Sequence, residues 1–225
     1  MADVEGDAGR AVAEEIGGSS VQVDVARAED NDRLYTQTWR RYRHVDAAVH
    51  AAGICPPEDG SILDIGLEAW RRVQDVNLLG VCLGCHAVLP ILLAQGSGSI
   101  VNVASTAALL GAATSQLSYT ASKGGVLALT RELGVQFARS GVRVNAVLPG
   151  PVTTRLTRGL FADDAAVLER RLAHVPLGRF ADPTEIAAAI AYLASDDASF
   201  VTAASVVVDG GATAAYVTPH PPKLA

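Results

Sequence analysis

Charged residues are scarce in this 225-residue chain, and its middle has none: no Asp, Glu, Lys or Arg lies between Asp75 and Lys123. Lysine and arginine number 18, against 24 aspartate and glutamate residues, which gives a net charge of −6. Proteins that bind nucleic acids carry an excess of positive charge where they meet phosphates. The charge balance therefore argues against a nucleic-acid partner.

The uncharged stretch includes an apolar run, residues 76–94, whose length is close to the roughly 20 residues of a membrane-spanning helix. The run contains Asn77, His86 and Pro90, and no lysine or arginine closely follows it as an interfacial anchor. We therefore expect a buried helix beside a buried strand, and no membrane span. Residues 1–5 begin acidic and lack the apolar core of a secretory signal, so a cytoplasmic location is expected.

Cysteine is also scarce: the chain has three, at positions 55, 82 and 85. An odd number in a chain of this size indicates free thiols in a reducing compartment. Residues 82–86 read Cys-Leu-Gly-Cys-His and match the pattern of covalent haem attachment, but they lie inside the apolar run. The single methionine, Met1, is a poor second axial ligand. One Cys-x-x-Cys is weak evidence for zinc, so no metal site is predicted.

Strand-like and helix-like patterns alternate along the chain. Strands are expected at residues 20–25, 45–50, 99–104, 142–148 and 205–208. Helices are expected at residues 6–16, 30–43, 67–76, 78–94, 119–139 and 183–194. Strands separated by helices predict an α/β fold, a doubly wound parallel sheet with helices on both faces. We expect one domain over residues 1–217 and an extended tail over 218–225.

Tyr119 and Lys123 are the strongest candidates for chemistry. Four residues apart at the start of a helix, their side chains share a face, which brings the ammonium close to the phenol oxygen. A positive charge favours the ionised phenol, so we expect Lys123 to lower the pKa of Tyr119 toward neutrality, where it serves as acid and base. Ser105 follows the strand 99–104 and presents a hydroxyl at the carboxyl edge of the sheet, where open α/β folds bind ligands.

Together with these residues, several strings at consistent spacing resemble the short-chain dehydrogenase/reductase family. They are Asp24-Val25, His50-Ala51-Ala52-Gly53, Asn77, Arg143-Val144-Asn145, 149–154 (Pro-Gly-Pro-Val-Thr-Thr) and Val208-Asp209-Gly210-Gly211. The chain is most similar to the 3-oxoacyl-carrier-protein reductase and secondary-alcohol dehydrogenase branches. The resemblance implies a Rossmann-like fold and an NAD(P)-dependent oxidoreductase that moves a hydride between nicotinamide and a small alcohol or ketone. It also implies a homotetramer or homodimer.

The resemblance implies roles for individual residues. Tyr119 would be the general acid/base, and Lys123 would lower its pKa and hold the nicotinamide ribose. Ser105 would hydrogen-bond the substrate oxygen, and Asn77 would keep a proton-relay water. The cofactor would be bound by Tyr119 and Lys123 and by Asp3, Asp24, Val25, Ala51, Ala52, Gly53, Pro149, Gly150, Val152 and Thr154.

Two of these implications concern specificity. Asp3 matches the acidic residue that accepts from the adenosine ribose hydroxyls, and a carboxylate there repels a 2′-phosphate, so NAD is expected rather than NADP. Residues 153–175 match the substrate lid. The apolar side chains at 109, 156, 160 and 161 favour an apolar substrate, although packing alone also explains them.

Some features depart from the family pattern. The usual Asn-Asn-Ala-Gly turn begins with His50 here, which removes an Asn side chain near the adenine ribose. The segment between Ser105 and Tyr119 is one residue longer than is usual in the family, and we expect the extra residue in a loop around 112–116. No glycine-rich turn follows a full strand near the start. We therefore expect a domain without its first strand, first helix and most of its second strand, with two empty strand positions between 20–25 and 45–50.

Alternative interpretations remain open. Taken singly, Asp24 also fits the end of a strand, Asn77 a helix cap and Thr154 a turn. For the whole chain, the alternative is a non-catalytic fragment or scaffold that assembles through its remaining helices. The helix containing Val88 and the helix after Tyr119 are expected to pack against another subunit, so that Val88→Asp should give smaller assemblies.

Overall fold

The computed structural model describes residues 1–112, 114–154, 157, 169 and 171–216. Strands and helices alternate along them, and the described strand pairs are all parallel. The strands are β1 (Ala2–Asp3), β2 (Val21–Gln22), β3 (Ala47–His50), β4 (Gly98–Val103), β5 (Val142–Pro149) and β6 (Ser205–Val208). The main helices are α1 (Gly6–Glu15), α2 (Ala28–Tyr42), α3 (Leu67–Gln74), α4 (Gly80–Gln95), α5 (Leu117–Gln136) and α8 (Pro183–Ala194). The predicted α/β class is confirmed.

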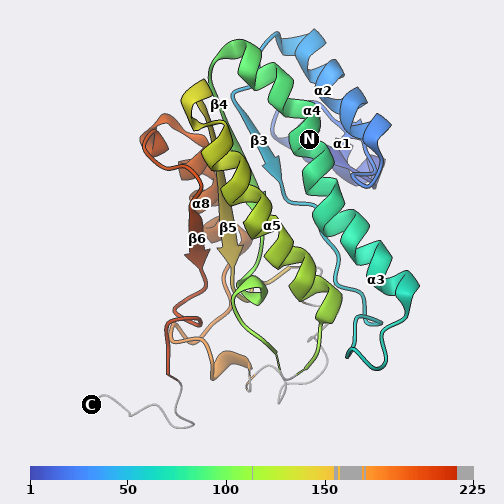
Figure 1. Cartoon of the computed structure of the whole chain (residues 1–225), viewed down its shortest axis with the longest axis vertical. Coiled ribbons are helices and arrows are strands. Elements are labelled where there is room, and N and C mark those ends of the chain that lie inside the picture. The colour runs from blue at the N-terminus through green and yellow to red at the C-terminus, as the bar shows by residue number, and fades with distance from the viewer. Residues whose placement is uncertain (113, 155–156, 158–168, 170, 217–225) are drawn as a thin grey trace.

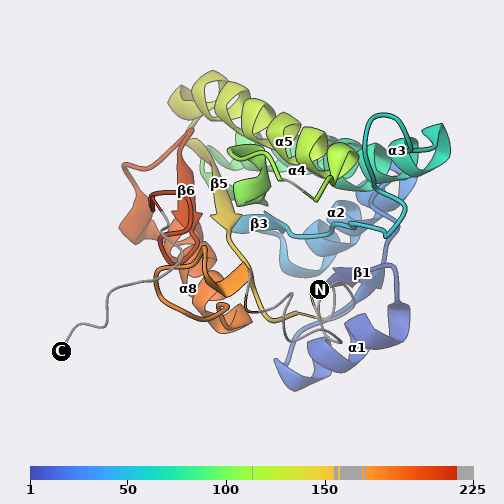
Figure 2. The ribbon, with the colours of Figure 1, turned by 90° about the horizontal axis from the view of Figure 1, so that it is seen from below.

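The strands form two sheets. β3, β4, β5 and β6 lie in that order in one sheet, whereas β1 and β2 form a separate pair, seen with α1 at the lower right of Figure 2. The prediction of two empty positions was wrong for one of them, because Ala2 and Asp3 form a short strand beside Val21 and Gln22. The described residues show no strand pairing between the two sheets, and Val49 of β3, the first strand of the larger sheet, is 45% exposed.

Helices cover both faces of the four-stranded sheet. α4 and α5 lie on one face and α8 on the other (Figure 2). Neighbouring residues of β4 belong to different hydrophobic cores. Ile100 packs in the core between the sheet and the helices α4 and α5, and Val101 packs in the core between the sheet and α8. Successive strand residues point to opposite faces, so a strand covered on both sides is apolar along its length.

Residues 67–95 form one continuous helical run (Figure 1), not two helices. α3 passes into a π-helical turn, Asp75–Leu79, and then into α4. By length and composition alone this run could cross a membrane, but core helices of soluble proteins share those properties. Val88 and Leu92 are fully buried in the core that α4 forms with the sheet. This burial explains the apolar composition of residues 76–94, as predicted.

The expectation that α4 presents Val88 to another subunit was wrong. Val88 is 0% exposed within the single chain, so its neighbours are already supplied by the chain's own core. The apolar side chains that these helices do expose include Leu93 on α4 and Val135 on α5. The predicted tail and most of the predicted lid, including residues 156, 160 and 161, lie outside the described residues.

Candidate active site

Ser105 lies at the carboxyl end of β4, as predicted. It begins a short 3-10 turn, Thr106–Ala108, and its Oγ accepts a hydrogen bond from the Ala107 N–H at 3.1 Å. The Ser105 hydroxyl is also close enough to the Tyr119 phenol to act as its hydrogen-bond partner, which favours the ionised phenol. The strand end and α5 therefore bring together two residues that are separated by a loop in the sequence.

α5 places Lys123 beside Tyr119, as their spacing predicts. Lys123 Nζ lies 5.6 Å from the centroid of the Tyr119 ring. The ammonium donates a hydrogen bond of 2.8 Å to the carbonyl of Val103, the last residue of β4, and the lysine side chain is buried. A hydroxyl, a phenol and an ammonium thus meet at one end of β4.

The pKa of Tyr119 moves in the direction opposite to our expectation. Burial of the phenol raises the pKa of Tyr119, and the opposing effect of the Ser105 hydrogen bond is smaller. Burial also lowers the pKa of Lys123 to about 8. Both shifts have the same cause, because removal from water disfavours the charged form of each group. The lysine hydrogen bond goes to the Val103 carbonyl, which leaves desolvation as the dominant influence on the phenol.

Asn77 is buried in the π-helical turn and joins two other elements. Its Oδ1 accepts from the Ile54 N–H at 2.8 Å, and its Nδ2 donates to the Ile54 carbonyl at 2.9 Å and to Ser122 Oγ at 3.2 Å. A Cβ atom added at Gly53 would lie 3.4 Å from both Asn77 Oδ1 and Lys123 Nζ. Asn77 therefore belongs to the same site and does not cap a helix.

Asp59 is a candidate that sequence reasoning missed. It is buried in the loop between β3 and α3, and its two carboxylate oxygens accept from the N–H groups of Ser118 and Tyr119, each at 2.8 Å. The first N–H groups of a helix have no hydrogen-bond acceptor within the helix, so a carboxylate placed there can accept their hydrogen bonds. Asp59 and Tyr119 are 60 residues apart in sequence. An aspartate in a proline-rich loop gives no distinctive signal of this contact.

His50, which replaces the usual asparagine, turns into the interior. Its Nε2 is hydrogen-bonded to the Tyr35 hydroxyl at 3.0 Å and its Nδ1 to Asn102 Oδ1 at 2.9 Å. A Cβ atom at Gly84 would lie 2.6 Å from His50 Nε2, so the ring fills the space beside α4. Burial lowers the pKa of His50, which favours the neutral ring. The backbone at Ala51, Ala52 and Gly53 remains exposed.

Asp3, Asp24 and Val25 form a second group, at the carboxyl ends of β1 and β2. Asp3 Oδ1 accepts from the Glu5 N–H at 2.9 Å, and Asp24 Oδ1 accepts from the Ala26 N–H at 3.0 Å. Both carboxylates therefore also stabilise local turns, which was the alternative interpretation of Asp24. Val25 packs close to α4: a Cβ atom at Gly80 would lie 2.8 Å from Val25 Cγ2.

The loop after β5 contains the remaining predicted cofactor residues, Pro149, Gly150, Val152 and Thr154. Gly150 donates to the Val208 carbonyl at 3.0 Å and has no room for a side chain, since its Cβ would lie 2.7 Å from Asp209 Cα. Val152 pairs with Ala181 in an isolated bridge. The Thr154 and Thr157 hydroxyls are 3.1 Å apart and hydrogen-bonded, so Thr154 serves a turn here.

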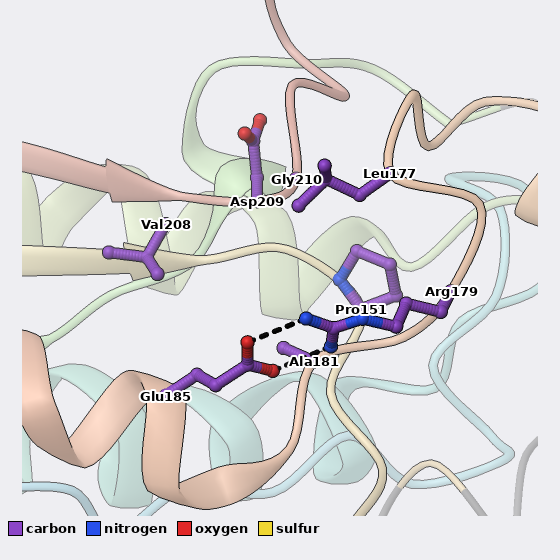
Figure 3. A pocket seen from close by; sticks show the side chains of 8 residues that line it. All are labelled: Pro151, Leu177, Arg179, Ala181, Glu185, Val208, Asp209 and Gly210. Carbon is purple, nitrogen blue, oxygen red and sulfur yellow. Dashed lines mark hydrogen bonds and ion pairs between the residues drawn. The ribbon is translucent and has the colours of Figure 1, made fainter.

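Two hollows flank these residues. The pocket in Figure 3 contains the Arg179–Glu185 ion pair at 2.7 Å. It is lined by Pro151, Leu177, Arg179, Ala181, Glu185, Val208, Asp209 and Gly210, none of which is among the predicted catalytic residues. A second, more open hollow is lined by Ile54, Cys55 and Pro56 on the loop that Asn77 holds, and by Arg72 on α3 and Val76 in the π-helical turn.

Comparison with known proteins gives consistent matches. Residues 1–213 match a family profile described as "Enoyl-(Acyl carrier protein) reductase". The chain is 45% identical over 195 residues to the cis-4-hydroxycyclohexanecarboxylate dehydrogenase of Sinomonas cyclohexanicum, covering 86% of this chain and 76% of that protein. It is 36% identical over 212 residues to a 3-oxoacyl-[acyl-carrier-protein] reductase of Synechocystis sp., covering 94% and 79%.

A solved structure agrees with these matches. A short-chain type dehydrogenase/reductase from Mycobacterium marinum superposes with a TM-score of 0.87 at 34% identity, covering 95% of this chain and 85% of that chain. With the parallel sheet covered on both faces and the tyrosine and lysine at its carboxyl edge, these matches make the chain a member of the short-chain dehydrogenase/reductase family of oxidoreductases.

Proposed function

We propose that this protein interconverts a secondary alcohol and a ketone with NAD, using Tyr119 as general acid/base. The observation that carries the proposal is the meeting of Ser105, Tyr119 and Lys123 at the end of β4. Relatives are named for hydroxyl-bearing substrates, including a meso-2,3-butanediol dehydrogenase of Serratia marcescens that is 37% identical over 195 residues, covering 87% of this chain and 75% of that protein.

Each of the residues has a defined task in such a reaction. In oxidation, the substrate hydroxyl gives its proton to the Tyr119 oxygen, and in reduction Tyr119 returns the proton to the ketone oxygen. The Ser105 hydroxyl, already beside the Tyr119 phenol, orients the same substrate oxygen. The charged Lys123 stabilises the phenolate, and Asn77 holds the loop beside both groups. Bound nicotinamide supplies the hydride acceptor or donor.

The residues present fit the nicotinamide half of the cofactor. Lys123 is buried, and among the described residues its ammonium donates one hydrogen bond, to the Val103 carbonyl. An ammonium has three donors, so the remaining ones suit ribose hydroxyls. Gly53 leaves space beside it, because it has no side chain. Among the described residues no glycine-rich turn follows β1 or β2, and we assign the pyrophosphate to no residue of this chain.

The preference for NAD over NADP is tested by kinetics. The exposed carboxylate of Asp3 at the end of β1 supports this preference, since it repels a 2′-phosphate. With a panel of cyclic and open-chain secondary alcohols and ketones, we expect turnover with NAD(H) and a preference over NADP(H) of about tenfold or more, the effect of roughly 1.4 kcal/mol. Asp3→Asn should reduce that preference. A folded protein without turnover on any substrate would instead support the non-catalytic scaffold.

The pH dependence of ketone reduction should follow the loss of the positive charge of Lys123. Its pKa of about 8 lies below that of a free lysine, so its charge is lost as the pH rises through 8. In ketone reduction Tyr119 must be protonated, and its raised pKa keeps it so. We therefore expect kcat/KM for reduction to fall above pH 8, by up to roughly tenfold per pH unit. Lys123→Arg keeps a positive charge and should flatten this limb. A level wild-type profile well above pH 8 would contradict the assignment.

The proposed assembly is a cytoplasmic homotetramer or homodimer. The exposed apolar side chains of Leu93 and Val135 on α4 and α5 support contacts between subunits at these helices. The three cysteines are free, with Cys82 exposed, which supports a reducing compartment.

A further inference from the structure

The loop between β3 and α3 is attached to the site at two points. Near its start, Asn77 hydrogen-bonds both the N–H and the carbonyl of Ile54. Further along the loop, and well before α3 begins at Leu67, the carboxylate of Asp59 accepts from the N–H groups of Ser118 and Tyr119 in the first turn of α5. Residues 54–60, termed the brace loop, therefore connect Asn77 with Tyr119.

We propose that Asp59 is a positioning residue, which fixes the first turn of α5 so that the Tyr119 phenol remains aligned with Ser105. The inference rests on the proposed role of Tyr119 as general acid/base. Asp59 acts through the backbone: its contacts are to the N–H groups of Ser118 and Tyr119, not to the phenol oxygen. It is therefore distinct from the residues that contact the substrate.

The geometry of the contact restricts both position and rotation. One carboxylate accepts from two consecutive N–H groups at 2.8 Å each, so the start of α5 can neither slide nor turn without breaking one bond. Hydrogen bonds to an ionised acceptor are stronger than those between neutral groups. Because a misplacement of about 1 Å costs on the order of 100-fold in rate, this restraint bears directly on turnover.

Other contacts keep α5 in place when Asp59 is altered. Ser118 Oγ donates to the Trp70 carbonyl at 3.0 Å, and Gln74 Nε2 donates to the Ser118 carbonyl and hydroxyl at 2.9 Å each. These bonds attach the start of α5 to α3 independently of the brace loop. Variants of Asp59 are therefore expected to fold, with a loss of alignment at Tyr119 and not of α5 as a whole.

The test compares Asp59→Ala, Asp59→Asn and a matched control, Glu58→Gln. Glu58 is the preceding residue on the same loop, is exposed, and lies 3.6 Å from Arg72. We expect Asp59→Ala to lower kcat about 10- to 100-fold with KM values for NAD and alcohol nearly unchanged. Asp59→Asn keeps one acceptor oxygen and should recover part of kcat. Glu58→Gln should match the wild type.

If the wild type is active, any of three outcomes overturns the inference. One is a folded Asp59→Ala variant with wild-type kcat. Another is a loss of kcat with a proportional change in KM and a much lower melting temperature, which indicates a general structural role. The third is a Glu58→Gln variant that loses as much activity as Asp59→Ala.

If the wild type shows no turnover, the proposed function fails, and a second measurement decides the role of Asp59. In NMR spectra of protein labelled at tyrosine Cζ, the Tyr119 signal is identified by its loss in Tyr119→Phe. The Ser105 hydrogen bond lowers the pKa of Tyr119, so loosening it in Asp59→Ala should move the signal and delay its titration to higher pH. A signal that coincides with the wild type at every pH overturns the inference.

Discussion

Replacing Tyr119 by phenylalanine should abolish turnover, lowering kcat/KM by about 1,000-fold or more. The substitution removes the phenol oxygen beside Ser105, on the ring that lies 5.6 Å from Lys123 Nζ, and so removes the group proposed to carry the proton. General acid/base catalysis by a positioned side chain is worth roughly 100- to 10,000-fold. The fold should survive, since a lost hydrogen bond costs only about 1 kcal/mol.

The measurement is NADH-dependent ketone reduction under saturating cofactor. Tyr192→Phe is a matched control, because Tyr192 lies on α8 on the opposite face of the sheet and is 47% exposed. It should retain wild-type activity. If Tyr119→Phe retained activity as well, the proton would have to come from another group and the proposed mechanism would fail.

Val88→Asp should prevent folding of the chain. Val88 is completely buried between α4 and the sheet, where a carboxylate would lose its hydration among apolar side chains. An unpaired buried charge costs several kcal/mol even after its pKa has shifted. The total stability of a domain is only about 5–15 kcal/mol, so little or no folded protein should remain.

Circular dichroism and thermal unfolding measure this effect. The control is Val4→Asp, the same change at a position outside α4 and α5 that is 61% exposed, which should alter the melting temperature little. A folded Val88→Asp variant that differed only in the size of its assembly would contradict the placement of Val88 in the core and return it to a subunit interface.

Much of the fold could be predicted because its signals are local. The period of apolar residues located α2, α5 and α8 to within a few residues of their observed ends. The strand expected at 20–25 was harder, because only Val21 and Gln22 have partners in β1, and pairing depends on distant residues. Two helices were expected at 67–76 and 78–94, where the structure has one continuous run through the π-helical turn. Asn77 in this turn bonds to Ile54, which is far away in sequence, so the local pattern does not indicate the contact.

The candidate site divides in a similar way. Tyr119 and Lys123 were predictable, because four-residue spacing on a helix brings side chains together regardless of the rest of the fold. The direction of the Tyr119 pKa shift was not, because burial is a property of the packed molecule and outweighs the opposing effect of Ser105. Asp59 was not predictable either, since its partners become neighbours only after α5 docks against the loop.

The separation of β1 and β2 from the larger sheet has a consequence for local opening. β4 and β5 each share hydrogen bonds with two neighbours, whereas the two-residue strands β1 and β2 have only each other. α1 buries just Gly9 and Ala13, so detaching this helix together with β1 exposes little apolar surface. Its free energy of opening should lie well below that of global unfolding. Asp3, and with it the proposed discrimination between cofactors, therefore depends on a segment that should open more easily than the four-stranded sheet.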